Sequence, residues 1–195
     1  MMKKTKVAFL DRDGTINEEK GYIKEPSEIE IISGSAGAVE KLNKAGYLVF
    51  GISNQSGIAR GYFSVDDVLK VNRRTIELVG EGGGEIIEIF FCPHHPEGSV
   101  PEYSMKCGCR KPGTNLITEA SEKYGLEFTE KIVIGDKICD LELGKRIGAV
   151  TVLVATGYGA SERKNLEEMQ MAGPDLHAEN LAQAVDLILG NSNSG

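Results

Sequence analysis

Long apolar runs are absent from this chain of 195 residues. No stretch approaches the ~20 consecutive apolar residues that a membrane-spanning helix needs, so we expect no membrane insertion. The basic start of the chain is followed only by the brief apolar run Val7–Leu10, which is too short for the apolar region of an export signal. The sequence therefore predicts a cytoplasmic protein.

An excess of positive charge is also missing. The formal net charge of −7 argues against nonspecific binding to nucleic acid or to an anionic membrane. The acidic balance does not exclude a phosphorylated substrate, because a few cations gathered in one place suffice to bind an anion. The candidates for such a local positive site are Arg60, Arg110, Lys111 and Lys137.

Cysteine is scarce, and in a chain without an export signal the four cysteines are not expected to form disulfides. Three of them join a histidine in two pairs of donors, Cys92-Pro-His94 and, after twelve further residues, Cys107-Gly-Cys109. Thiolate and imidazole are ligands that tetrahedral Zn²⁺ favours, and four protein donors fill its coordination sphere. We therefore predict a structural zinc ion that closes the loop 92–109.

Two alternatives remain around this predicted zinc site. His95 competes with His94 as the fourth ligand, although the Cys-x-His spacing of His94 mirrors the Cys-x-Cys pair. Free thiols without a metal are the other alternative. Cys139 is left over, and we expect it to be a small buried residue.

The pattern of apolar residues predicts an alternation of strands and helices. Strands rich in Val, Ile or Phe are expected at 6–10, 47–53, 86–91, 131–135 and 149–154, and helices at 35–45, 64–80, 114–124, 138–147 and 179–189. Such alternation is typical of right-handed βαβ units and a central parallel sheet flanked by helices. With no internal repeat and no long linker, we expect a single domain over 1–190 and a disordered tail at 191–195.

The most informative segment is Asp11-Arg-Asp13-Gly-Thr, which directly follows the first predicted strand. Open α/β sheets keep their active sites at the carboxyl ends of their strands. Along a continuing strand, Asp11 and Asp13 would point to the same side. One carboxylate could then attack as a nucleophile while the other handles the proton, and a divalent cation could restrain their repulsion. An ordinary Asx turn is the alternative interpretation.

Three further motifs follow in order along the chain. The second predicted strand ends in Ser53-Asn54, and the fourth ends in Gly135-Asp136, with Asp140 one helical turn beyond. Between them stands Arg110-Lys-Pro112, whose proline is placed to start a helix. An acid pair, a hydroxyl, a lysine and a final acid in this order resemble the four motifs of the haloacid dehalogenase (HAD) superfamily of phosphohydrolases. The resemblance runs from about Val7 to Gly157.

The resemblance implies a Rossmann-like HAD fold and a role for each motif residue. Asp11 would form an aspartyl-phosphate, and Asp13 would act as general acid and then as general base. Ser53 and Lys111 would hold the phosphoryl oxygens, and Asp140 would orient Lys111 or the metal waters. Mg²⁺ would bind Asp11, the backbone carbonyl of Asp13, and Asp136. No segment has room for the large cap domain of many HAD phosphatases, so the loop 92–109 is the sizeable insertion.

Longer motifs narrow the resemblance to one family. The segments at 11–17, 53–61, 92–100 and 107–112 resemble those of D-glycero-D-manno-heptose 1,7-bisphosphate phosphatases, whose reaction removes the C7 phosphate on the way to a nucleotide-activated heptose. Histidinol-phosphate phosphatase, or a broader sugar-phosphate phosphatase, is the alternative. Histidinol-phosphate phosphatases resemble this chain less, because the gap between their two pairs of zinc ligands is shorter than the twelve residues found here. The family resemblance implies a sugar bisphosphate substrate, a monomeric state, and substrate contacts at Glu19, Lys20, Gly21, Tyr22, Ser53, Asn54, Gln55, Ser56, Arg110, Lys111 and Lys137. Arg60 is predicted either to contact substrate or to brace its loop.

Overall fold

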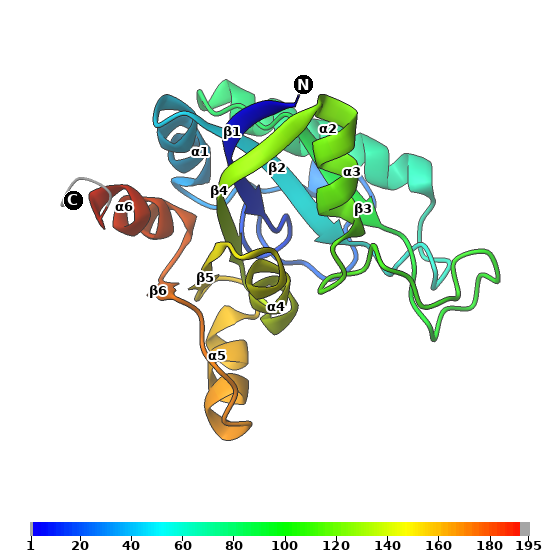
Figure 1. Ribbon diagram of the computed structural model, residues 1–195. Helices are drawn as coiled ribbons and strands as arrows, with labels where there is room; N and C mark the ends of the chain where they lie inside the picture. Colours follow the sequence, from blue (N-terminus) through cyan, green and yellow to red (C-terminus); the bar gives the residue numbers. More distant parts are fainter. Residues whose placement is uncertain (1, 192–195) are drawn as a thin grey trace.

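The computed structural model describes residues 2–191, and its centre is a six-stranded sheet (Figure 1). The spatial order of the strands is β3-β2-β1-β4-β5-β6, and every neighbouring pair is parallel. The strands are β1 (Lys3–Leu10), β2 (Tyr47–Asn54), β3 (Glu88–Cys92), β4 (Leu126–Gly135), β5 (Val150–Val154) and β6 (Leu176–Ala178). The predicted parallel sheet is confirmed. The chain reverses its direction of winding between β1 and β4, and in open α/β sheets such a switch point is where ligands bind.

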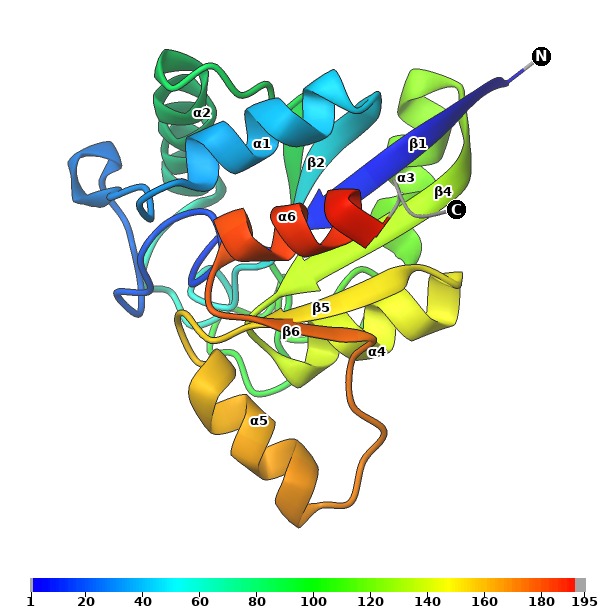
Figure 2. The same ribbon diagram turned by 90° about the vertical axis from the view of Figure 1, so that its left-hand side faces the viewer.

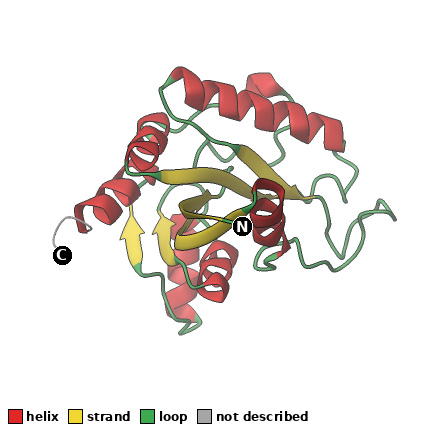
Figure 3. Ribbon diagram, turned by 45° about the horizontal axis from the view of Figure 1, so that its top comes forward, coloured by secondary structure: helices red, strands yellow, loops and turns green. Residues whose placement is uncertain are grey.

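Helices cover both faces of the sheet (Figure 3). One face carries α1 (Ser35–Lys44), α2 (Val65–Glu81) and α6 (Leu181–Asn191), and α1 and α6 lie in front of the strands in Figure 2. The opposite face carries α3 (Asn115–Tyr124) and α4 (Ile138–Ile147). The remaining helix, α5 (Gly159–Glu168), lies beyond the carboxyl end of β5. A 3-10 turn, η1 (Pro26–Glu28), packs against α2.

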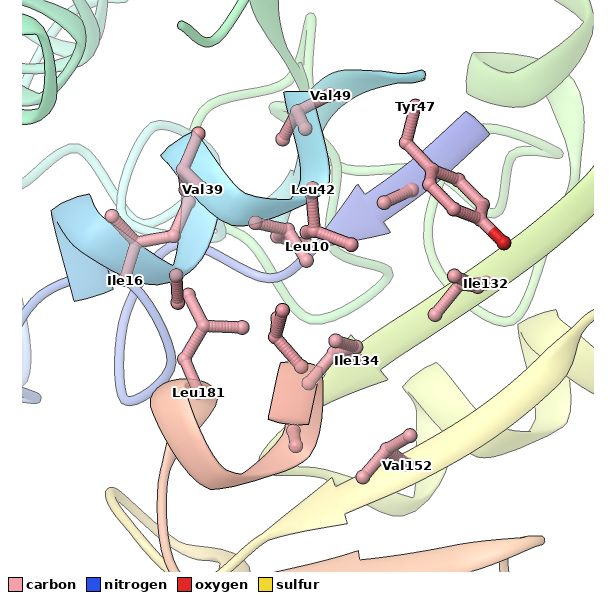
Figure 4. Close-up of a cluster of buried hydrophobic side chains, with 14 of the residues drawn as sticks. Leu10, Ile16, Val39, Leu42, Tyr47, Val49, Ile132, Ile134, Val152 and Leu181 are labelled. Carbon is pink, nitrogen blue, oxygen red and sulfur yellow. The ribbon is translucent and has the colours of Figure 1, made fainter. Parts of the chain in front are cut away.

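Alternating side chains of β1 pack into two separate hydrophobic cores on opposite faces of the sheet. Ala8 and Leu10 belong to the core under α1 and α6, part of which is shown in Figure 4. Val7 and Phe9 belong to the core under α3 and α4, where the Phe9 ring packs edge-on against Phe128 at 5.4 Å between centroids. Because all four residues are buried, β1 is held from both faces, and its carboxyl end is a rigid support for the residues that follow.

The five predicted strands and five predicted helices are all present, and the starts of α3 and β4 differ from expectation. The helix predicted over 114–124 begins at Asn115, and Pro112 does not start it, because a turn closed by Gly113 N–H donating to the Arg110 carbonyl intervenes. The Lys111–Pro112 peptide in this turn is cis. β4 begins at Leu126, earlier than expected, because its charged first half pairs with the start of β1.

One strand and one α-helix were not predicted, and neither was the 3-10 turn η1. The strand β6 has only three residues, and α5 is almost entirely polar, so neither produces a strong apolar pattern. Asn191 still belongs to α6, so that helix reaches the first residue of the predicted tail; the rest of the tail lies outside the described residues. Among the residues described, we find no helix with the length and apolar character required to cross a membrane.

Candidate active site

A cavity of about 280 Å³ opens at the carboxyl ends of β1 and β2, next to the switch point of the sheet. The structure brings most of the predicted catalytic and substrate-binding residues to its walls. Those that line it are Asp11, Asp13, Glu19, Gly21, Tyr22, Ser53, Asn54, Gln55, Ser56, Arg110, Lys111 and Lys137. Lys20 does not line the cavity, because its ammonium pairs with Glu30 at 2.6 Å. Tyr158 and Cys139 line it although neither was predicted to do so.

Lys111 lies at the centre of a buried charge network. Its Nζ is 2.8 Å from Asp11 Oδ1 and 2.6 Å from Asp140 Oδ1, and it also donates to the carbonyl of Ile52 at 2.7 Å. Burial alone would lower the pKa of Lys111, but the charges of Asp11 and Asp140 raise that pKa above its usual range. The ammonium therefore stays charged, and it holds the Asp11 carboxylate at the floor of the cavity.

Three carboxylates converge beside Lys111. Asp11, Asp136 and Asp140 each place an oxygen within 4.8 Å of the others, and all three residues are buried. Burial, followed by repulsion from Asp11, raises the pKa of Asp136 to about 7, and burial raises the pKa of Asp140 to about 6. Buried oxygen donors that resist ionisation in one another's presence are well suited to a divalent cation such as Mg²⁺.

The backbone is pressed closely around Asp136. Gly14 and Gly157 both have positive φ, and a Cβ built on either would come within 2.2 Å of Asp136 Oδ2. The hydroxyl of Thr156 donates to the Gly14 carbonyl at 2.6 Å, and the Tyr158 N–H donates to Asp136 Oδ2 at 2.8 Å. Glycine is therefore required on both sides, because any side chain would displace the carboxylate.

Asp13 does not join the three clustered carboxylates. β1 ends at Leu10, so strand alternation does not extend to Asp13, and its carboxylate instead forms a two-pronged pair with Arg12 at 2.7 and 3.0 Å. Burial raises the pKa of Asp13, but Arg12 and hydrogen bonds from Asn17 and Gln55 outweigh it and hold that pKa below its usual range. Arg12 is 1% exposed, and it also donates to Asn72 on α2 at 2.7 Å. Arg12 was not among the predicted site residues, although it stands between the two acids in the sequence.

The end of β2 connects the other motifs. Gln55 Nε2 donates to Ser53 Oγ at 2.8 Å and to Asp13 Oδ2 at 2.9 Å. The Asn54 side chain accepts from the Lys111 N–H at 2.9 Å and donates to the Lys111 carbonyl at 3.2 Å. Asn54, which was predicted as a substrate contact, therefore also fixes the backbone that presents Lys111.

Four donors of the 92–109 loop form a second cluster, on the loop that projects beyond β3 in Figure 1. The Cys92, Cys107 and Cys109 sulfurs lie 3.0 to 3.4 Å from one another, and His94 Nδ1 lies 3.2 Å from Cys109 Sγ. The structure brings His94 rather than His95 to the three thiols. The donor set and its compactness are compatible with a tetrahedral metal ion.

Arg110 links the Cys/His cluster to the cavity. Its Nη1 donates to the His94 carbonyl at 3.3 Å, and its side chain lines the cavity wall. Arg60 is not part of that wall. Its N–H donates to the Ser56 carbonyl at 3.1 Å, and its own carbonyl accepts from Ser99 Oγ at 3.1 Å, so its backbone connects the 56–60 turn to the 92–109 loop.

Comparison with known proteins gives consistent results. Residues 108–184 match the HAD-hydrolase-like family. The chain is 41% identical over 160 residues to a D-glycero-alpha-D-manno-heptose-1,7-bisphosphate 7-phosphatase of Photorhabdus laumondii, which covers 82% of this chain and 87% of the relative. It is 39% identical over 185 residues to a D-glycero-D-manno-heptose-1,7-bisphosphate 7-phosphatase of Thermosynechococcus vestitus, covering 92% and 93% of the two chains.

The chain is also 41% identical over 155 residues to a D-glycero-beta-D-manno-heptose-1,7-bisphosphate 7-phosphatase of Haemophilus influenzae. The match covers 78% of this chain and 83% of the relative. Among solved structures, D,D-heptose 1,7-bisphosphate phosphatase of B. bronchiseptica, complexed with magnesium and phosphate, superposes with a TM-score of 0.79. Its identity to this chain is 29%, and the match covers 95% of this chain and 99% of the other.

Proposed function

The chain belongs to the family of D-glycero-D-manno-heptose-1,7-bisphosphate 7-phosphatases within the HAD-like hydrolases, and from this membership we propose that it removes the C7 phosphate of the heptose bisphosphate. It is a phosphoric monoester hydrolase. The observation that supports the assignment most is the buried Asp11–Lys111–Asp140 network at the floor of the cavity. A network of this kind holds a carboxylate nucleophile beside a fixed positive charge, as phosphoryl transfer requires.

Asp11 is the proposed nucleophile. A bond forms between its carboxylate oxygen and phosphorus while the bond from phosphorus to the sugar oxygen breaks, and water then hydrolyses the aspartyl-phosphate. Lys111 and Ser53 hold the phosphoryl oxygens, where negative charge must be stabilised in the transition state. Both side chains are buried at the cavity wall, so the phosphoryl group leaves bulk water when it reaches them.

Asp13 is the proposed acid and base. In the first step it gives a proton to the departing sugar oxygen, and in the second it takes one from the attacking water. Its pairing with Arg12 favours the ionised form, whereas an arriving phosphate brings further negative charge close to Asp13 and raises its pKa. Substrate binding thus favours the protonated carboxyl that the first step needs.

Two metal ions fit the donor sets. Mg²⁺ would be held by Asp11, the Asp13 backbone carbonyl and Asp136, and when bound it offsets charge between the phosphate and the acids. The solved relative contains magnesium and phosphate together, which supports this choice. Asp140 is assigned to Lys111 instead, because its two oxygens already accept from Lys111 Nζ and from the Lys137 N–H. Zn²⁺ would be held by Cys92, His94, Cys107 and Cys109, where it would stabilise the 92–109 loop that directly precedes Arg110.

The sugar and its second phosphate would occupy the rest of the cavity. Arg110 and Lys137 supply positive charge there, and Glu19, Gly21 and Tyr22 form the wall on the side of the 19–22 segment. Removal of the C7 phosphate leaves heptose 1-phosphate, a precursor of nucleotide-activated heptose. The names of the relatives favour this substrate over histidinol phosphate.

Phosphate release in the presence of Mg²⁺ tests the proposal. We would compare the alpha and beta anomers of the heptose bisphosphate with histidinol phosphate, because one of the relatives is named for the alpha anomer and another for the beta anomer. We expect a strong preference for one heptose anomer, and we expect Asp11→Asn to lower kcat by about 10⁴-fold or more. Faster hydrolysis of histidinol phosphate would contradict the substrate assignment, and activity retained in Asp11→Asn would contradict the nucleophile.

A further inference from the structure

Tyr158 is an exposed tyrosine at the rim of the cavity. It is 46% exposed, it lies just before α5, and its side chain lines the cavity wall. Its ring lies beside Lys137, with Nζ 4.8 Å from the ring centroid. The face of an aromatic ring attracts an ammonium ion at this separation. The Tyr158 ring therefore contacts the Lys137 ammonium on one side.

The backbone, rather than the side chain, holds Tyr158 in place. Its N–H donates to Asp136 Oδ2 at 2.8 Å. The preceding Gly157 packs against Gly14, and Thr156 is hydrogen-bonded to the Gly14 carbonyl. A substitution of the Tyr158 side chain keeps these backbone contacts, so it changes the surface next to Lys137 without changing the support of Asp136.

Lys137 has three carboxylate neighbours besides the ring. Its Nζ lies 3.1 Å from Asp136 Oδ1, 3.4 Å from Glu19 Oε2 and 3.9 Å from Asp11 Oδ2. Asp11 and Asp136 are also proposed ligands of Mg²⁺, and a divalent cation bound to them would repel the ammonium. Glu19 and the ring of Tyr158 are the neighbours that remain available to Lys137 in that state.

Next to the Lys137 ammonium, an aromatic ring differs from a further carboxylate in its effect on the charge. It attracts the ammonium without cancelling its charge, so the charge remains available to an anion in the cavity. We propose that Tyr158 is a positioning residue whose ring holds the Lys137 ammonium in the cavity, where it binds an anionic oxygen of the phosphorylated substrate. This rests on the proposed function, because it uses the substrate contact assigned there to Lys137.

Two substitutions separate the ring from the size of the side chain. Tyr158→Leu keeps an apolar side chain but removes the ring, whereas Tyr158→Phe keeps the ring and removes the hydroxyl. We expect Tyr158→Leu to raise KM for the heptose bisphosphate about two- to fivefold with kcat unchanged. Tyr158→Phe should retain the KM of the parent protein. Equal KM values in the Leu and Phe variants, or a change confined to kcat, would overturn the proposal.

A double-mutant cycle tests whether the ring acts through Lys137. In a Lys137→Gln background, Tyr158→Leu should cause no further rise in KM, because the cation it positions is already missing. A rise as large as in the parent background would show that the ring acts on something else. Melting temperatures of all variants check that the fold is intact.

Binding of inorganic phosphate, measured by calorimetry with and without Mg²⁺, separates this proposal from the proposed function. The Leu variant should bind phosphate about two- to fivefold more weakly than the Phe variant when Mg²⁺ is present. Equal phosphate affinities would overturn the role of Tyr158 even if the heptose bisphosphate is the substrate. If the parent protein does not hydrolyse the heptose bisphosphate, the phosphate affinities still decide whether the ring positions Lys137.

Discussion

Two clusters of potential metal ligands in this protein are assembled in different ways. The acid–lysine cluster gathers residues from the ends of β1 and β4, the start of α4 and the turn after Arg110; its members are Asp11, Lys111, Asp136, Lys137 and Asp140. The thiol cluster lies within the 92–109 loop, and of its four members only Cys92 belongs to a strand; the others are His94, Cys107 and Cys109.

The two clusters also differ in how their charges are balanced. In the acid–lysine cluster, ammonium groups and backbone N–H groups face the carboxylates; the Lys111 ammonium, for example, contacts both Asp11 and Asp140. In the thiol cluster, the sulfurs lie beside one another and beside one imidazole. The acid–lysine cluster therefore contains opposite charges that attract one another, whereas the thiol cluster contains no such opposite charge, and in the proposed function a bound Zn²⁺ would supply it. The difference leads to predictions that can be ordered by the expected loss of stability.

Cys107→Ser should have the largest effect. We expect the variant to lose about one equivalent of zinc and about 4 kcal/mol of unfolding free energy, because the loop loses the ion that closes it. Zinc content by atomic emission and denaturant unfolding measure the two losses. Cys139→Ser is the matched control, since Cys139 lies outside the thiol cluster, and it should keep its zinc. An unchanged zinc content in Cys107→Ser would contradict the proposal that the thiol cluster holds a zinc ion.

Gly14→Ala should have the next largest effect. The alanine would adopt a φ of +83° and place its Cβ 2.2 Å from Asp136 Oδ2, so we expect a loss of about 3 kcal/mol and a large fall in activity. Gly21→Ala shares the left-handed backbone, with a φ of +79°, but its Cβ meets nothing within 4 Å. It should lose only about 1 kcal/mol. Equal losses in the two variants, measured by denaturant unfolding, would show that the contact with Asp136 contributes nothing.

Asp140→Asn should have the smallest effect on stability, about 1 kcal/mol, because Lys111 keeps its contact with Asp11 and the amide oxygen can still accept from the Lys137 N–H. Activity should fall more clearly, by about 10- to 100-fold in kcat, since Lys111 loses one of the groups that orient it. Magnesium affinity, measured by calorimetry, should change little. A collapse of magnesium affinity would instead identify Asp140 as a metal ligand.

The main elements and the motif residues could be predicted because their signals are local. Apolar runs marked five of the six strands, and the parallel sheet then followed from their alternation with helices. Asp11, Ser53, Lys111 and Asp136 were recognisable because each stands at or near the end of such a run or beside a proline. The short β6 and the polar α5 carry too little apolar pattern to be found in this way.

The resemblance had suggested that Asp140 orients Lys111. The other partners of the motif residues could not be predicted, because most of them lie in segments that are distant in the chain. Strand alternation suggested that Asp11 and Asp13 share a side, but β1 ends at Leu10, and Gln55, which follows β2, donates to the Asp13 carboxylate. The ring of Tyr158 reaches Lys137 only because the Gly157 turn packs against Gly14.

The sequence by itself determined the order of strands and helices, the chemical types in each motif and the spacing of the thiol ligands, since propensity and hydrophobic periodicity act over short stretches. The tertiary structure alone decided which charges meet. It placed Lys111 between Asp11 and Asp140 and raised the pKa of Asp136 to about 7. The physical reason is that burial and Coulomb interactions depend on distances in space, and only the packed sheet brings distant residues within a few ångströms of one another.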